Sequence, residues 1–135
     1  MSLEVRATAA RRRSWGGWAT IAVVLLSASP APMAAAPNGK ALFEERCAAC
    51  HTVKRSEPEG MAPPLGGVVG RKVAGVAGWR YSPALTKLGG AWTVQRLDAF
   101  IADPQKVARG TSMGVQEPNA LERAAIIQHL KTLRP

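Results

Sequence analysis

Glycine and proline crowd the stretch between residues 51 and 81 too densely for regular secondary structure. Proline fixes its φ angle and lacks a backbone donor, and glycine raises the entropy of the unfolded chain. We therefore predict no β-ladder and no long helix here, but a loop of about 30 residues, and loops of that length in compact domains are commonly functional. Its prolines and glycines are Pro58, Gly60, Pro63, Pro64, Gly66, Gly67, Gly70, Gly75 and Gly78.

Helical patterns flank this loop on both sides, and no run of residues alternates as a strand does. Ser82, which is followed by proline, is typical of a helix start, and so is Thr93. Asn119 precedes the clearest helical pattern and has Glu122 three residues later, as in a capping box. The aspartate–proline pair at 103–104 should end the helix that Thr93 begins. We predict an all-α fold with helices over 39–50, 82–88, 93–103 and 119–133.

The apolar core available to such a fold is small. The chain has 135 residues, and a domain formed by the part after position 36 is only marginally stabilised by its own core. We therefore expect that something other than side chains fills its centre. The aromatic residues of this part are Phe43, Trp79, Tyr81, Trp92 and Phe100.

The start of the chain does not continue the helical pattern. Three consecutive arginines precede a mostly apolar run at 18–28, and small residues follow. This order predicts a secretory signal peptide over 1–36, cleaved near 34–37, and a domain over 37–135. The run of 11 residues is shorter than the ~20 that a membrane helix needs, so an uncleaved anchor is the weaker alternative. We expect a periplasmic protein without stable membrane insertion after cleavage.

The predicted domain is basic. Residues 37–135 hold 14 Lys and Arg against 8 Asp and Glu, and the formal charge of the whole chain is +9. Such a balance suits an acidic protein, a membrane surface or nucleic acid, or it only keeps the surface solvated. Because the basic residues are scattered along an exported chain, we expect no nucleic-acid partner.

The distinctive chemistry lies in Cys47–His51, of sequence CAACH, which contains the only two cysteines of the chain. Two residues between the cysteines let both sulfurs form thioethers with one haem, and the next residue then places an imidazole at the iron. A disulfide, a thioredoxin-like redox pair and half of a zinc site are the alternatives. A redox pair would follow a strand in a βαβ unit, and a zinc site would need more ligands than His129 adds.

Further landmarks accompany this motif over most of residues 38–133. Together they resemble class I cytochromes c, in particular the small mitochondrial-type and c2-like bacterial members. The resemblance implies three main helices, short helices and a long loop wrapped around one haem c. It also places Gly39 and Phe43 against the C-terminal helix near His129, which we interpret as a packing residue. The landmarks are GKALF at 39–43, CAACHTV at 47–53, PPLGGVVGR at 63–71, WRYSPAL at 79–85, Trp92, and GTSM at 110–113.

The resemblance gives expectations for the iron ligands. It implies that Cys47 and Cys50 hold the haem covalently. It implies that His51 is the proximal ligand, with its ring fixed by the carbonyl oxygen of Pro63. Met113 takes the place of the distal ligand, and its soft, neutral thioether favours ferrous iron. His51 and Met113 are therefore the expected metal ligands.

Three more positions match family residues that hydrogen-bond the haem propionates. Two carboxylates beside an apolar macrocycle need paired charges and donors. Taken alone, the arginine could equally well be an ordinary surface residue, and each of the two aromatics an ordinary core residue. We interpret Met61, the other methionine of the predicted domain, as a surface or packing residue. The three propionate-binding candidates are Arg71, Tyr81 and Trp92.

The resemblance predicts an electron carrier rather than an enzyme, because filled axial positions leave the iron no open site. We expect a monomer with transient redox partners that have acidic docking faces, and Arg46, Lys106 and Arg109 as candidate docking residues. The segment after Met113 is one residue shorter than in close relatives, which predicts a looser loop there. The alternatives are a five-coordinate haem that binds ligands or reduces peroxide, and a haem c subunit of a periplasmic dehydrogenase.

Overall fold

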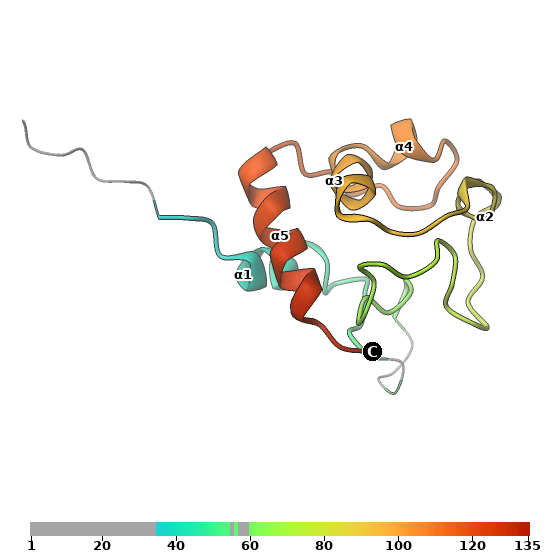
Figure 1. Cartoon of the computed structure of the whole chain (residues 1–135), viewed down its shortest axis with the longest axis horizontal. Helices are drawn as coiled ribbons and strands as arrows, with labels where there is room; N and C mark the ends of the chain where they lie inside the picture. The colour runs from blue at the N-terminus through green and yellow to red at the C-terminus, as the bar shows by residue number, and fades with distance from the viewer. Residues whose placement is uncertain (1–34, 55, 57–59) are drawn as a thin grey trace, which may run out of the picture. The chain divides into compact units, whose positions relative to one another are not determined.

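The computed structural model describes residues 35–54, 56 and 60–135, which contain five helices. The predicted signal peptide lies outside the described residues, apart from its last two positions. Across the described ranges, no helix has the length and apolar character needed to cross a membrane. Those ranges also form no named strand, in agreement with the predicted all-α fold. The helices are α1 (Gly39–Arg46), α2 (Pro83–Leu88), α3 (Val94–Ala102), α4 (Pro104–Val107) and α5 (Ala120–Thr132) (Figure 1).

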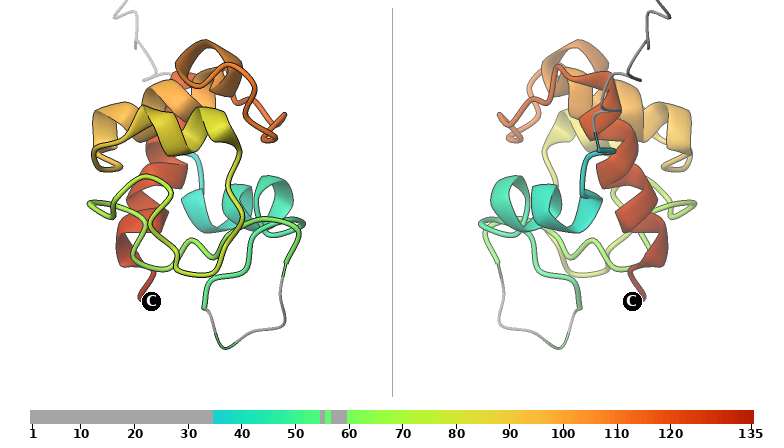
Figure 2. Two further views of the ribbon diagram at one scale, coloured as in Figure 1. Left: turned by 90° about the vertical axis from the view of Figure 1, so that its right-hand side faces the viewer. Right: turned by 90° about the vertical axis from the view of Figure 1, so that its left-hand side faces the viewer.

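The fold is organised by the crossing of α1 and α5, which pack against each other (Figures 1 and 2). Gly39 stands at this crossing, and a Cβ atom there would collide with the backbone carbonyl of Ala125. Phe43 is buried, and its ring lies 5.2 Å from that of His129 with a tilt of 56°. The expected packing of Gly39, Phe43 and His129 is therefore present.

α1 ends at Arg46 rather than at Cys50, so the predicted helix was too long. The amides of Cys47 and Ala48 both donate to the carbonyl of Phe43, at 2.9 and 3.0 Å. One shared acceptor cannot continue a ladder in which each amide reaches the carbonyl four residues earlier. The chain therefore leaves the helix at the first cysteine and turns through residues 47–50.

α2 and α3 begin at their predicted caps. The hydroxyls of Ser82 and Thr93 each accept a hydrogen bond from the amide three residues later, at 3.3 and 3.1 Å. α3 ends next to the 103–104 pair as predicted, but the sequence interpretation missed the short helix α4 that follows. Asp103 serves both helices. It is the C-cap of α3, and its Oδ1 caps the start of α4 by accepting a hydrogen bond from the amide of Lys106 at 3.0 Å.

α5 begins after Asn119 as predicted, but the capping box is incomplete. The Asn119 side chain accepts from the amides of Leu121 and Glu122 at 2.9 and 3.4 Å. The Asn119 amide, however, donates to Glu117 Oε1 at 2.9 Å instead of to Glu122. The carboxylate of Glu122 lies 2.7 Å from a guanidinium nitrogen of Arg46, and this ion pair replaces the reciprocal bond of the box. Three buried residues of α5 belong to the hydrophobic core: Ile126, Ile127 and Leu130.

The long loop after the motif forms no named element in its described residues, as predicted. Among the described residues, one isolated backbone bridge joins Lys72 to Ala91, and another joins His51 to Ala62. Further along, a Cβ atom on Gly66 would collide with the carbonyl oxygens of Val53 and Arg134, so the backbones pack closely there. In Figure 1, α3 lies beside the first half of α5, and the long loop lies near the last residues of α5. Both contribute to one hydrophobic core, which includes Val68, Val73, Leu97, Phe100 and Ile127.

Candidate functional site

Cys47 and Cys50 are half-buried free thiols. Burial raises the pKa of the Cys47 thiol, and the positive charge of Arg46 opposes this shift without cancelling it. A thiol with a raised pKa is a poor redox nucleophile, which disfavours a catalytic dithiol. In the described ranges, no group of three or more His, Cys, Asp or Glu side chains is placed to hold a metal ion. The described residues therefore supply no further ligands that would complete a zinc site.

His51 is oriented by a hydrogen bond to the backbone. Its Nδ1 lies 2.7 Å from the carbonyl oxygen of Pro63, the partner that the resemblance implies. Because a carbonyl can only accept, Nδ1 carries the proton and Nε2 keeps its lone pair for a metal. Burial lowers the pKa of His51; the charge of Arg71 adds to this shift and the Pro63 hydrogen bond opposes it. The site thus favours the neutral imidazole that binds metal ions.

Arg71 is fixed beside the residues that orient His51. Its Nη2 donates to the carbonyl of Pro64 at 2.9 Å, and its Nη1 donates to the carbonyl of Gly66 at 3.1 Å. The amide of Trp92 donates to the carbonyl of Arg71 at 2.8 Å, and the Trp92 carbonyl accepts from the amide before Arg71 at 2.8 Å. The structure therefore brings Arg71 and Trp92 together, next to the segment of Pro63.

The two aromatic candidates differ in how they are held. Trp92 is buried, and its ring lies 4.9 Å from that of Phe100. Tyr81 is half-buried, and its hydroxyl accepts a hydrogen bond from the amide of Val76 at 3.2 Å. A hydroxyl that accepts one bond can still donate its own proton. This contact ties Tyr81 to its own loop, so its place beside the other site residues rests on the resemblance.

Met113 lies in a loop of residues 108–117, which we call the distal loop. It is half-buried and packs against the hydrophobic core, as Cys47 does. Gln105 braces the turn before it: Nε2 donates to the carbonyl of Thr111 at 2.8 Å, and Oε1 accepts from the amide of Gly110 at 3.0 Å. Met61 is 80% exposed, which agrees with its interpretation as a surface residue.

Sequence reasoning missed a buried ion pair beside the motif. Glu117 is 3% exposed, and its carboxylate pairs with the guanidinium of Arg46. Arg46, one of the candidate docking residues, lies between the two carboxylates of Glu117 and Glu122 and remains partly exposed. Local spacing carries no signal for this contact, because the pair joins positions that are far apart along the chain.

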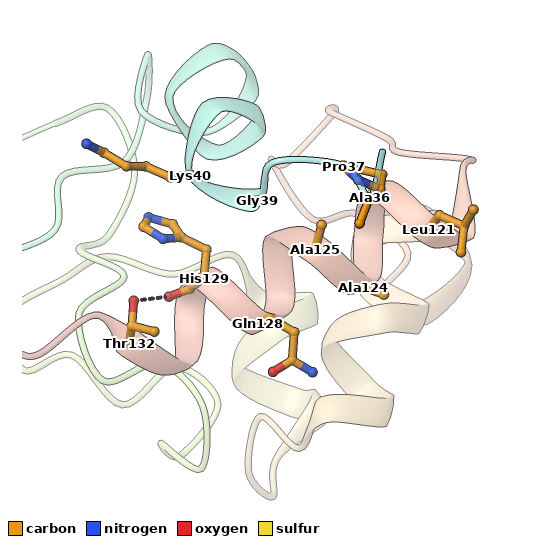
Figure 3. Close-up of a pocket in the computed structure, with 10 residues that line it drawn as sticks. All are labelled: Ala36, Pro37, Gly39, Lys40, Leu121, Ala124, Ala125, Gln128, His129 and Thr132. Atoms are coloured by element: carbon orange, nitrogen blue, oxygen red, sulfur yellow. Dashed lines mark hydrogen bonds between the residues drawn. The ribbon is translucent and has the colours of Figure 1, made fainter. Parts of the chain in front are cut away.

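A hollow of about 520 Å³ lies between the residues that lead into α1 and one face of α5 (Figure 3). It contains none of the residues predicted to bind a cofactor, so it is separate from the candidate site. Its lining includes Pro37, Lys40, Leu121, Ala125 and His129.

Comparison with known proteins gives a consistent picture. The sequence model of the family described as Cytochrome c matches residues 36–134. A "Cytochrome c homolog" of Rickettsia felis is 39% identical over 100 residues, which cover 72% of this chain and 55% of the relative. "Cytochrome c-type cyt cy" of Rhodobacter capsulatus is 39% identical over 73% of this chain and 49% of its own length. "Cytochrome c2" of Rhodopila globiformis is 41% identical over 72% of this chain and 92% of its own length. The chain thus spans about half the length of the first two relatives.

The donor set fits the cofactor of this family. Two free thiols stand at the spacing that two thioether bonds require. The imidazole that follows them is oriented through Nδ1, which leaves Nε2 for iron. The guanidinium of Arg71 is held nearby by the carbonyls of Pro64 and Gly66. With its all-α fold and this site, the chain belongs to the cytochrome c family as a class I member, and its cofactor is covalently bound haem c.

Proposed function

We propose that the protein carries single electrons on a haem c whose iron is bound by His51 and Met113. The observation that carries this proposal is the hydrogen bond from His51 Nδ1 to the carbonyl of Pro63, directly after the two cysteines. This bond fixes the tautomer and the ring orientation that an axial ligand needs. The haem supplies a one-electron ferric–ferrous couple when it is bound.

The proposed haem-binding residues have two roles, which are to attach the haem and to set the reduction potential of its iron. Cys47 and Cys50 would hold the haem through thioether bonds, so it cannot leave between partners. His51 would bind iron through Nε2, and Met113 through its thioether sulfur. Both ligands are neutral, and the soft thioether favours ferrous iron and raises the reduction potential. The core packing of Cys47 and Met113 supports a water-poor site.

We also propose that Arg71, Tyr81 and Trp92 bind the haem propionates. Their guanidinium, hydroxyl and indole groups are all hydrogen-bond donors. Arg71 is already held by the carbonyls of Pro64 and Gly66, so its charge is fixed before any ligand binds. A donor that is fixed in advance reorganises little when the charge of the site changes.

We propose further that residues 1–36 are a signal peptide and that residues 37–135 act in the periplasm as a monomeric carrier, not as an enzyme. Partners would be redox proteins whose acidic faces dock transiently. The exposed side chains of Lys106, in α4 just before the distal loop, and of Arg109, within that loop, support this view. Such exposed charges speed encounter with an oppositely charged partner and are screened by salt.

An optical spectrum of the ferric and ferrous holoprotein tests the ligand set. We expect the wild type to show the red charge-transfer band of a methionine-bound ferric haem. Met113→Leu should abolish this band, and the control Met61→Leu should keep it, since Met61 is 80% exposed. Both substitutions conserve side-chain volume, so the pair separates ligation from folding. Haem bands without the methionine band in the wild type would overturn His51/Met113 ligation.

That outcome would favour the second candidate, a five-coordinate haem that binds ligands or reduces peroxide. The observation behind this candidate is the exposure of residues 114–116, directly after Met113. A loop with so little packing of its own can release a distal ligand more easily than a buried one. Binding of imidazole or cyanide to the ferric wild type at micromolar concentration would distinguish this candidate from the electron carrier.

A further inference from the structure

Glu117 is the last residue of the distal loop and is buried, with 3% of its surface exposed. A carboxylate is almost never fully buried unless it is paired. A buried ion pair is weak evidence for stability, because apolar residues of similar volume often stabilise a core equally well. Because an apolar residue can stabilise the core equally well, the charge at this position points to a role in positioning the chain.

Four contacts fix Glu117 from three helices. Its carboxylate pairs with Arg46 of α1 and accepts from the amide of Asn119 at 2.9 Å. Its own amide donates to the carbonyl of Ile101 in α3 at 2.9 Å. Its carbonyl accepts from Nη1 of Arg123 in α5 at 3.0 Å. These contacts anchor the end of the distal loop.

The residues between Met113 and Glu117 have little support of their own. All three are exposed, and a Cβ atom on Gly114 would meet nothing within 4 Å. Gln116 reaches Asp103 only at 3.4 Å, which is long for a hydrogen bond. On this side, the position of Met113 therefore depends on where Glu117 is held.

We propose that Glu117 is a positioning residue that keeps Met113 at the iron, by clamping the end of the distal loop to Arg46. Arg46 directly precedes Cys47, so the clamp connects the distal loop to the segment that binds the haem. The inference rests on the proposed His51/Met113 ligation. Glu122 pairs with the same guanidinium but lies in α5, outside the distal loop, so it orients Arg46 without holding Met113.

The test compares Glu117→Gln with the matched control Glu122→Gln in the ferric holoprotein. Both variants remove one carboxylate from Arg46, but only the first loosens the distal loop. Imidazole can replace Met113 only when that loop opens, so its apparent affinity, measured by optical titration, reports the clamp. Replacing a charged hydrogen bond by a neutral one should raise this affinity about tenfold in Glu117→Gln. The control should stay within about twofold of the wild type, as expected for a partly exposed ion pair.

Amide hydrogen exchange gives a second readout that does not depend on ligation. We expect faster exchange over residues 112–116 in Glu117→Gln, with the wild-type pattern kept in Glu122→Gln. Equal imidazole affinity and equal exchange in both variants and the wild type would overturn the inference. If Glu117→Gln yields no folded holoprotein, Glu117→Asp, which keeps the charge but draws it back by one methylene group, replaces it with the same expected direction.

The two readouts also separate failure of the clamp from failure of the proposed ligation. A wild type without the methionine band, but with faster loop exchange in Glu117→Gln, would reject Met113 as ligand and keep Glu117 as the anchor of the loop. A wild type with the band, but with no change in either readout for Glu117→Gln, would keep the ligand and reject the anchor.

Discussion

The two segments that carry the proposed ligands are held in different ways. The proximal segment, residues 47–54 and 60–66, is fixed mainly by its own backbone. The amides of Ala62, Leu65 and Gly66 donate to carbonyls of its first part at 2.8 to 2.9 Å. The side chain of His51 also bonds to a backbone carbonyl. Most of these contacts survive a change of side chain, so the proximal ligand should be hard to misplace by substitution.

The distal loop, in contrast, is held mainly by side chains at its two ends. Gln105 braces its start through Gly110 and Thr111, and Glu117 fixes its end through Arg46. The amide of Met113 itself donates only to a hydroxyl, at 3.5 Å. Single substitutions at the two ends should therefore change how firmly Met113 is held, while the fold and the proximal ligand remain.

The largest effect should come from removing the covalent links of the proximal segment. The double substitution Cys47→Ser/Cys50→Ser should leave a chain without a cooperative thermal transition in circular dichroism, because its own core is small. Met113→Leu, which touches only the distal loop, is the control and should keep both haem and transition. A cooperative melt of the haem-free double variant would show that the protein core suffices on its own.

The next effect compares one glycine from each segment. A methyl group at Gly66 would collide with the carbonyl oxygens of Val53 and Arg134, whereas one at Gly114 would meet nothing within 4 Å. Gly66→Ala should lower the free energy of unfolding by about 2 kcal/mol or more. Gly114→Ala should leave it unchanged or raise it by up to about 1 kcal/mol. Guanidinium chloride unfolding of the holoproteins measures both, and the reverse ranking would contradict the comparison.

Much of the proximal segment could be predicted from the sequence, while the distal supports could not. The CAACH motif is local. The resemblance supplied the His51–Pro63 contact, and these two residues also lie near one another in the sequence. The helix caps Ser82 and Thr93 were predictable for the same reason. Glu117 pairs with a residue far away in the sequence, and its burial leaves no periodic trace. The ion pairs of Arg46 were therefore not foreseen, and α4 was missed because it is a single short turn that begins with a proline.

A smaller effect is expected from the first brace of the distal loop. Gln105→Ala removes two hydrogen bonds, to Gly110 and Thr111, and should raise the apparent affinity of the ferric protein for imidazole about fivefold. Gln95→Ala is the control, because Gln95 is an exposed residue of α3 with the same side chain. The thermal midpoint should move little in both variants. An equal affinity in the two variants would mean that Met113 is positioned without Gln105.

The smallest effect concerns docking, where the comparison predicts that the two segments differ again. If partners approach over the distal loop, Lys106→Gln should slow oxidation by an acidic protein about twofold at low ionic strength. Lys72→Gln, an equal charge change in the part of the long loop that follows the proximal segment, should not. Both are exposed, so neither change should alter folding. The difference should vanish as salt shortens the Debye length to about 3 Å near 1 M. A rate that falls equally in both variants would mean that net charge, rather than a distal docking face, guides the encounter.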